Sequence, residues 1–116
     1  MPAATYVMHV EGRDHFVRVG HYSTSASKRL RQVGDQGEAW AIAASEECLT
    51  KATACAVEML TQALLQEHGA IRPVASGRRT LIYSCSTDEA VRALRYAKAS
   101  VDTALDAFLE HRRFPR

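Results

Sequence analysis

The sequence predicts an α/β fold, in which a small mixed sheet of about four or five strands packs against a long central helix and an additional C-terminal helix. Short segments rich in β-branched and aromatic residues alternate with longer segments whose apolar residues recur at helical spacing. The chain has 116 residues, of which 47% are hydrophobic, and this size and composition suit one globular domain spanning residues 1–116.

The N-terminal half predicts strands around one short helix. Residues 6–10 and 16–19 have strand composition, and the turn-like tetrapeptide 11–14 separates them. A polar run then leads into residues 28–33, where a short basic helix is expected. Residues 38–44 predict the next strand.

A long helix is expected to follow. Ser45 is a suitable N-cap, and Glu46 and Glu47 place negative charge on the first turn, where the helix dipole favours it. The helix should continue to about His68 and end at Gly69. Its expected buried face comprises Leu49, Ala52, Ala56, Leu60, Ala63 and Leu64, widened by Cys48, Cys55 and Met59.

Two further strands are predicted at residues 70–75 and 80–85, around a hairpin tip at residues 76–79. Pro73 lacks a backbone donor, so the first of these strands is expected at an edge or as a loop.

The segment 86–111 carries the most regular helical pattern in the chain. Residues 86–89, Ser-Thr-Asp-Glu, form a capping box. Packing of the apolar stripe over the domain's own sheet is favoured, and docking of a partner helix is the alternative. Residues 112–116 are expected to form a basic tail. The stripe comprises Ala90, Leu94, Ala97, Val101, Ala104 and Phe108.

Charge is sorted along the chain, although the formal net charge is only +2. Residues 13–33 include five basic residues and one acid, and residues 69–82 include three basic residues and no acid. The segment between them, 34–68, holds six acids and one lysine. If folding brings the two basic segments to one face, a polyanion is the expected partner. The alternative is that each run is a solvated loop.

The expected nucleic-acid-binding residues lie in and beside these basic segments. An aromatic residue, a run of hydroxyl side chains and several cations follow one another, and this mixture suits phosphate contacts. The tip at 76–79 adds two guanidinium groups that can reach along a groove. The predicted binding residues are Lys28, Arg29, Arg31, Arg72, Arg78, Arg79 and Tyr22.

The sequence contains no recognisable catalytic or metal-binding pattern. The histidines lack zinc-site spacing and no CxxC occurs. A nucleophilic Cys85 paired with a distant histidine is the one enzymatic alternative, and an inert buried thiol is the commoner situation. Cys48 and Cys55, seven positions apart on an expected helix, are too distant to bridge. We therefore expect reduced cysteines, no enzymatic activity, no cofactor and no metal.

The order of elements and one local motif resemble the Alba-like nucleic-acid-binding proteins, whose fold is βαβαββ. Residues 49–52, Leu-Thr-Lys-Ala, and 58–60, Glu-Met-Leu, are similar to the family's apolar-Ser/Thr-Lys-Ala motif and its following Glu-Ile-Leu. The resemblance covers residues 16–85 and leaves 1–15 as an extra N-terminal strand. It implies that Lys28, with Arg29, lies near the family's phosphate-binding lysine and that Arg78 and Arg79 occupy a mobile hairpin tip.

We therefore predict a protein that contacts the phosphate backbone of RNA or DNA with low sequence specificity. We expect a homodimer, or a heterodimer with a related chain. No apolar run approaches the roughly 20 residues that cross a bilayer, so a membrane partner is not expected. The expected location is the cytoplasm, or the nucleus in a eukaryote. The alternative function is that of a protein-interaction or scaffold subunit, which dimerises or docks a partner through the C-terminal helix.

Overall fold

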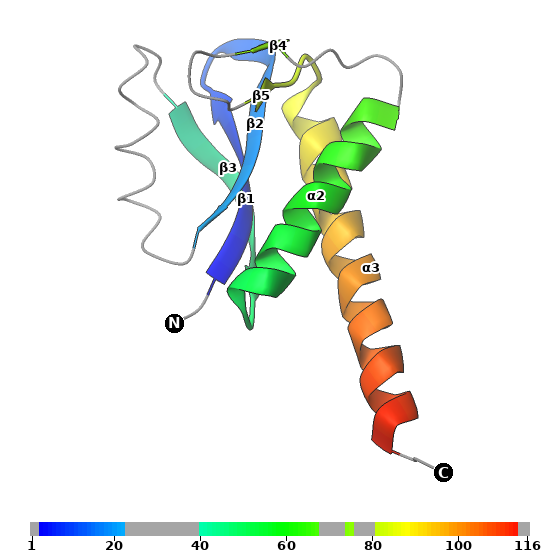
Figure 1. Ribbon diagram of the computed structural model, residues 1–116. Coiled ribbons are helices and arrows are strands. Elements are labelled where there is room, and N and C mark those ends of the chain that lie inside the picture. Colours follow the sequence, from blue (N-terminus) through cyan, green and yellow to red (C-terminus); the bar gives the residue numbers. More distant parts are fainter. Residues whose placement is uncertain (1–2, 23–39, 68–73, 76–80, 114–116) are drawn as a thin grey trace.

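A computed structural model describes residues 3–22, 40–67, 74–75 and 81–113. It confirms the mixed α/β class, with a three-stranded antiparallel sheet and two helices along one side (Figure 1). The predicted sheet of four or five strands and the βαβαββ order are not confirmed. The elements are β1 (Ala3–Val10), β2 (Arg13–Tyr22), β3 (Trp40–Cys48), α2 (Lys51–Glu67), β4 (Val74–Ala75), β5 (Leu81–Ile82) and α3 (Thr87–Arg113).

The predicted N-terminal hairpin forms, and its first strand lies at the centre of the sheet. The strand order is β2-β1-β3, so β1 pairs antiparallel with both neighbours. Gly12 makes the tight turn after β1 with a φ of 81°, a conformation that side chains with a Cβ adopt at a cost. His9 pairs with Val17. The segment that the family resemblance left outside its core is therefore the strand that organises the sheet.

The boundary between β3 and α2 differs from the prediction. Ser45, Glu46 and Glu47 do not begin the helix, because β3 continues to Cys48 in register with Ala3 of β1. The helix begins at Lys51, and the Thr50 hydroxyl caps it by accepting a hydrogen bond from the Thr53 amide at 3.1 Å. Both candidate caps have suitable chemistry, and pairing with β1 decides between them.

The helices cover one face of the sheet, and α2 does so with a different stripe from the predicted one. The predicted Ala52, Ala56 and Ala63 are exposed, and Met59 is 68% exposed. Leu60 and Leu64 are partly buried. The fully buried residues of α2 are Ala54, Val57, Thr61 and Leu65. Small side chains occur on every side of this helix, so the spacing pattern alone did not separate the two faces.

The opposite face of the sheet carries a second cluster of large side chains. Tyr6 and Met8 of β1 are buried there with Trp40 of β3. The Phe16 ring stacks on Trp40 with centroids 5.3 Å apart, and the buried Arg18 guanidinium lies 4.7 Å from the Trp40 ring centroid. The sheet therefore has an apolar cluster on each side.

Of the two strands predicted after α2, the described residues include Val74–Ala75 and Leu81–Ile82. Val74 pairs with Ile82 and Ala75 with Leu81, which makes a two-stranded ladder. Tyr83 then exchanges two backbone hydrogen bonds with Val17 of β2, at 2.8 and 3.1 Å. The predicted helix at 28–33 and the hairpin tip lie outside the described residues.

The capping box at the start of α3 is confirmed. The Ser86 hydroxyl accepts a hydrogen bond from the Glu89 amide at 3.1 Å, and the Glu89 carboxylate accepts one from the Ser86 amide at 3.4 Å. From there α3 crosses the domain beside α2 and continues beyond it (Figure 1). Within the described ranges, no helix is both long and apolar enough to span a bilayer.

Candidate interaction surface

Six of the seven predicted binding residues lie outside the part of the chain that the structure describes. The seventh, Tyr22, is the last residue of β2, and its ring stacks on Tyr6 with centroids 5.7 Å apart. Tyr22 is partly exposed on the sheet face that carries the aromatic cluster. The six outside the described residues are Lys28, Arg29, Arg31, Arg72, Arg78 and Arg79.

The apolar stripe of α3 divides into a packed half and a projecting half. Ala90, Leu94 and Ala97 are fully buried against the domain's own core, as the favoured prediction required. Val101 is partly buried, and every described side chain from Thr103 to His111 is exposed. Phe108 continues the same stripe and is 63% exposed. The second half of α3 therefore keeps a core-type face with no covering element among the described residues.

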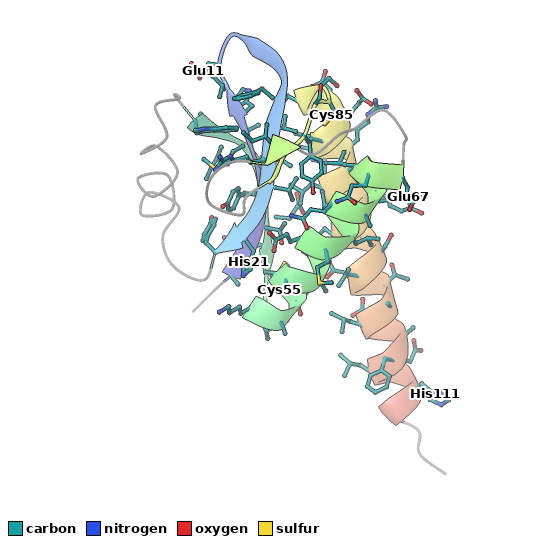
Figure 2. The ribbon with its side chains drawn as sticks, turned by 45° about the horizontal axis from the view of Figure 1, so that its top comes forward. Glu11, His21, Cys55, Glu67, Cys85 and His111 are labelled. Atoms are coloured by element: carbon teal, nitrogen blue, oxygen red, sulfur yellow. The ribbon has the colours of Figure 1, made fainter. Side chains whose placement is uncertain are left out.

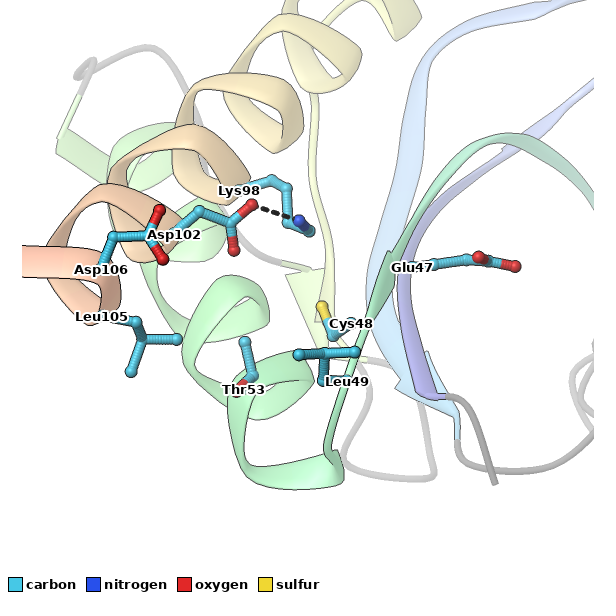
Figure 3. Close-up of a pocket in the computed structure, with 8 residues that line it drawn as sticks. All are labelled: Glu47, Cys48, Leu49, Thr53, Lys98, Asp102, Leu105 and Asp106. Carbon is cyan, nitrogen blue, oxygen red and sulfur yellow. Dashed lines mark hydrogen bonds and ion pairs between the residues drawn. The ribbon is translucent and has the colours of Figure 1, made fainter. Parts of the chain in front are cut away.

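Further large apolar side chains adjoin this projecting half. Leu105 and Leu109 are 41% and 50% exposed, and Leu49, in the connection between β3 and α2, is 95% exposed. Leu49 and Leu105 line opposite sides of one groove (Figure 3). Clustered apolar side chains of this size at a protein surface mark an interaction site more often than isolated ones do.

The groove itself has a volume of about 710 Å³ and an acidic border. Asp102 and Asp106 line it from α3, and Glu47 lines it from the end of β3. Lys98 is the basic residue that lines the groove, and it donates a hydrogen bond to Asp102 (Figure 3). This hydrogen bond raises the pKa of Lys98, so Lys98 stays protonated. The groove therefore combines apolar walls with more negative than positive groups.

A second constellation lies at the end of β2, where it meets α2. His21 Nδ1 is 2.7 Å from Glu58 Oε1, and His21 Nε2 is 3.3 Å from Cys55 Sγ. Figure 2 labels His21 at the end of β2 and Cys55 on α2. His21, for which the sequence showed no zinc-site spacing, is half-buried against the helix. The sequence does contain a signal for this burial. Val17, Val19 and His21 alternate along β2, so His21 lies on the same strand face as the two buried valines.

The other two cysteines are buried core residues. Cys85 is 3% exposed, and burial raises the pKa of its thiol to about 11. Burial also raises the pKa of Cys48, which lies in β3 and not on a helix with Cys55. All three cysteines are free. A protonated, enclosed thiol disfavours the nucleophilic role considered for Cys85.

The described residues include no group of three or more His, Cys, Asp or Glu side chains arranged to hold a metal ion. Comparisons of the chain with protein-family models, with curated proteins and with solved structures gave no match.

Proposed function

We propose that this protein is an interaction subunit that self-associates through the projecting half of α3. The observation that carries this proposal is the exposure of Leu105, Phe108 and Leu109 on a helix whose first half buries the apolar stripe that Phe108 continues. Burying such side chains is worth about 1.5–3 kcal/mol each, which gives association a substantial driving force. The occupant of this face is the same half-helix of a second copy.

An antiparallel arrangement of the two projecting halves suits their apolar residues. With Leu105 opposite Phe108 of the second copy, the relation is reciprocal, because Phe108 then faces Leu105 of that copy. Ala104 and Leu109 come opposite each other in the same register. Reciprocal contacts of this kind define the symmetric interface of a twofold dimer.

Charge supports the same arrangement. The last turn of α3 contains Arg112 and Arg113. In the antiparallel register this turn of one copy lies opposite residues 100–102 of the other, which include Asp102 at the border of the groove. Opposite charges across an interface mainly fix orientation and register, and they add less to affinity than the apolar contacts do. Each copy supplies both signs, so a second copy satisfies this pattern.

Sedimentation analysis of matched variants tests this proposal. Phe108→Asp places a charge in the apolar seam, and we expect it to convert a dimer into a monomer at micromolar concentration. Tyr96→Asp is the control, because Tyr96 is 65% exposed on another side of the same helix, and this variant should remain dimeric. A monomeric wild type, or equal dissociation of both variants, would contradict self-association through this face.

A second proposed function is phosphate-backbone binding to RNA or DNA, with basic residues as the contacts. One structural observation favours it: both basic segments are attached to β2. Strand β2 is the first part of the basic segment 13–33, and the β4–β5 ladder within the basic segment 69–82 is linked to Val17 of β2 through Tyr83. Because both attachments are on one strand, a common positive surface is sterically reasonable.

Fluorescence polarisation with labelled RNA and DNA tests this second function. Log affinity should fall with log salt concentration at a slope of about 4 to 6, one for each phosphate contact. Replacing Arg78 and Arg79 by Ala should weaken binding similarly for all sequences and leave the melting temperature unchanged. Binding without salt dependence, or no binding at low salt, would exclude backbone recognition.

A further inference from the structure

The fold fixes His21 against α2 through a neighbouring buried contact. His21 pairs with Thr5 across the β1–β2 ladder. The fully buried Thr5 hydroxyl donates a hydrogen bond to the Ala54 carbonyl of α2 at 2.7 Å. This bond holds the second turn of α2 over the strand pair, and the residue after Ala54 is Cys55. The Cys55 thiol and the His21 ring therefore meet at a position set by the core.

The His21 ring lies between a thiol and a carboxylate. Cys55 Sγ is 3.3 Å from Nε2 and 3.9 Å from Nδ1, and Glu58 Oε1 is 2.7 Å from Nδ1. Cys55 and Glu58 are three positions apart on α2, so they project from neighbouring turns on the same side. With the Nδ1 proton donated to Glu58, Nε2 carries the free lone pair of the ring. The distances from Sγ to the two nitrogens place the sulfur over the ring beside Nε2, so the Cys55 side chain must turn toward the ring plane to pass its proton to Nε2.

The carboxylate is itself held in place. Gln62 donates from its side-chain nitrogen to Glu58 Oε2 at 3.5 Å and to the Val19 carbonyl at 3.4 Å. The side chains of His21 and Glu58 are 26% and 21% exposed, and Cys55 is partly exposed. The cluster is thus ordered by the fold and still open to a small molecule. A thiol beside an imidazole that a carboxylate orients is the arrangement that activates a cysteine nucleophile.

We propose that Cys55 is a reactive thiol that exchanges with low-molecular-weight disulfides of the glutathione type, with His21 as its general base and Glu58 as the residue that positions His21. Exchange needs only a thiol, a base and an accessible small disulfide, and the described residues supply the first two. This modification site is independent of both proposed functions.

The exchange involves only Cys55, His21 and the small disulfide. His21 Nε2 takes the proton from Cys55 as Sγ attacks one sulfur of the small disulfide. The new Sγ–S bond forms as the original S–S bond breaks, and the leaving sulfur takes the proton back from His21. Cys55 is oxidised to a mixed disulfide, and one half of the small disulfide is reduced to a thiol.

The other cysteines provide an internal comparison. Cys48 and Cys85 are 6% and 3% exposed, and burial raises the pKa of both thiols. Neither has an imidazole among the partners described for it. Thiol–disulfide exchange requires both a thiolate and access to it, so these two thiols should react only when the fold opens.

The experiment measures reaction of the native protein with glutathione disulfide and with an aromatic disulfide that releases a chromophore. We expect one fast-reacting thiol, mapped to Cys55 by peptide mass spectrometry, with a rate constant above that of free glutathione at the same pH. Cys48→Ala and Cys85→Ala should retain the fast phase, and Cys55→Ser should lose it. Comparable rates for all three thiols would overturn the proposal.

Variants of His21 and Glu58 distinguish a Cys55 thiol that these residues activate from one that reacts only because it is exposed. His21→Asn should slow the fast phase by at least about tenfold, as loss of a general base does. Glu58→Gln should slow it less and alter its pH dependence, because Gln retains a hydrogen-bond acceptor without the charge. A Cys55 rate equal to that of glutathione and unchanged by His21→Asn would refute the assignment.

A final control addresses folding. If His21→Asn loosened the docking of α2, Cys48 and Cys85 would also become reactive, and the number of fast thiols would rise above one. In that event the pH–rate profile of the wild type shows whether His21 acts as the general base. An inflection additional to that of a free thiol supports His21 as the base, and a profile identical to that of glutathione overturns it.

Discussion

At the scale of single residues, Gly20 shows how one side chain excludes another. Gly20 pairs with Tyr6 across the β1–β2 ladder, and a Cβ added at Gly20 would lie 2.5 Å from the Tyr6 hydroxyl oxygen. Tyr6 is only 2% exposed and stacks on Tyr22, so its ring has little room to move. The glycine is therefore required for space.

We predict that Gly20→Ala lowers the free energy of unfolding by about 1–3 kcal/mol, the usual cost of overpacking a filled site. Urea titration measures the effect. Gly12→Asn is the matched control, because nothing lies within 4 Å of its added Cβ, and Asn tolerates positive φ. If Gly20→Ala matched the stability of the wild type, the Tyr6 contact would not constrain this position.

A second residue-scale prediction concerns alkaline pH. The thiol of Cys85 has a usual pKa of 9.0, raised by burial to about 11. Below pH 9 both the folded and the unfolded chain keep the proton. Between pH 9 and 11 the unfolded chain ionises first, so the free energy of unfolding should fall as pH rises, by at most about 1.4 kcal/mol per pH unit from this group.

Chemical denaturation at several pH values checks this expectation. Cys85→Ala should reduce the alkaline loss of stability without abolishing it, because burial also raises the pKa values of Cys48 and Tyr83. An unfolding free energy that stayed constant from pH 8 to 11 would show that Cys85 is accessible to solvent in the folded protein.

At the scale of elements, two hydroxyl caps fix where the helices begin. Thr50 caps α2, and Ser86 caps α3 with Glu89 completing the box. Each cap satisfies an amide that has no partner within the helix. The start of α2 matters for the reactive-thiol proposal, because it sets the positions of Cys55 and Glu58 relative to His21.

We predict that Thr50→Ala and Ser86→Ala each lower the free energy of unfolding by about 0.5–2 kcal/mol. Thermal or urea unfolding followed by circular dichroism provides the measurement. Thr103→Ala is the control: Thr103 is exposed in the middle of α3, where alanine is the better helix former, so this variant should be at least as stable as the wild type.

At the scale of the whole molecule, α3 joins a packed region to a projecting one. The molecule is elongated, with principal extents of 56, 33 and 22 Å, and the projecting end of α3 accounts for its length in Figure 1. Ala90, Leu94 and Ala97 are fully buried and belong to the core, whereas residues 103–111 are exposed. One continuous helix therefore has a stabilising part and a part available for association.

Truncation after Thr103 should separate these two parts. We expect the shortened protein to unfold cooperatively, with a midpoint close to that of the wild type at submicromolar concentration, and to sediment as a monomer. Truncation after Leu94 removes the buried Ala97 and should prevent cooperative unfolding. If truncation after Thr103 left the dimer intact, the interface would lie elsewhere.

The sequence by itself determined those features that depend on local chemistry. The N-terminal hairpin with its glycine turn, the capping box before α3 and the regular stripe of α3 all follow from residues within one or two turns of each other. The expectation that Cys48 and Cys55 do not bridge is confirmed, but its reason, a shared helix, is wrong because Cys48 lies in β3.

The tertiary structure decided between alternatives that fit the local sequence equally well. Ser45 and Thr50 are both good caps, and pairing of Ala3 with Cys48 selects Thr50. Small residues on every side of α2 gave no contrast, so contact with the sheet chose its buried face. His21 and Cys55, 34 positions apart, meet because Thr5 anchors the helix to the strands. Spacing along the chain carries no information about such contacts, since they depend on how separate elements pack.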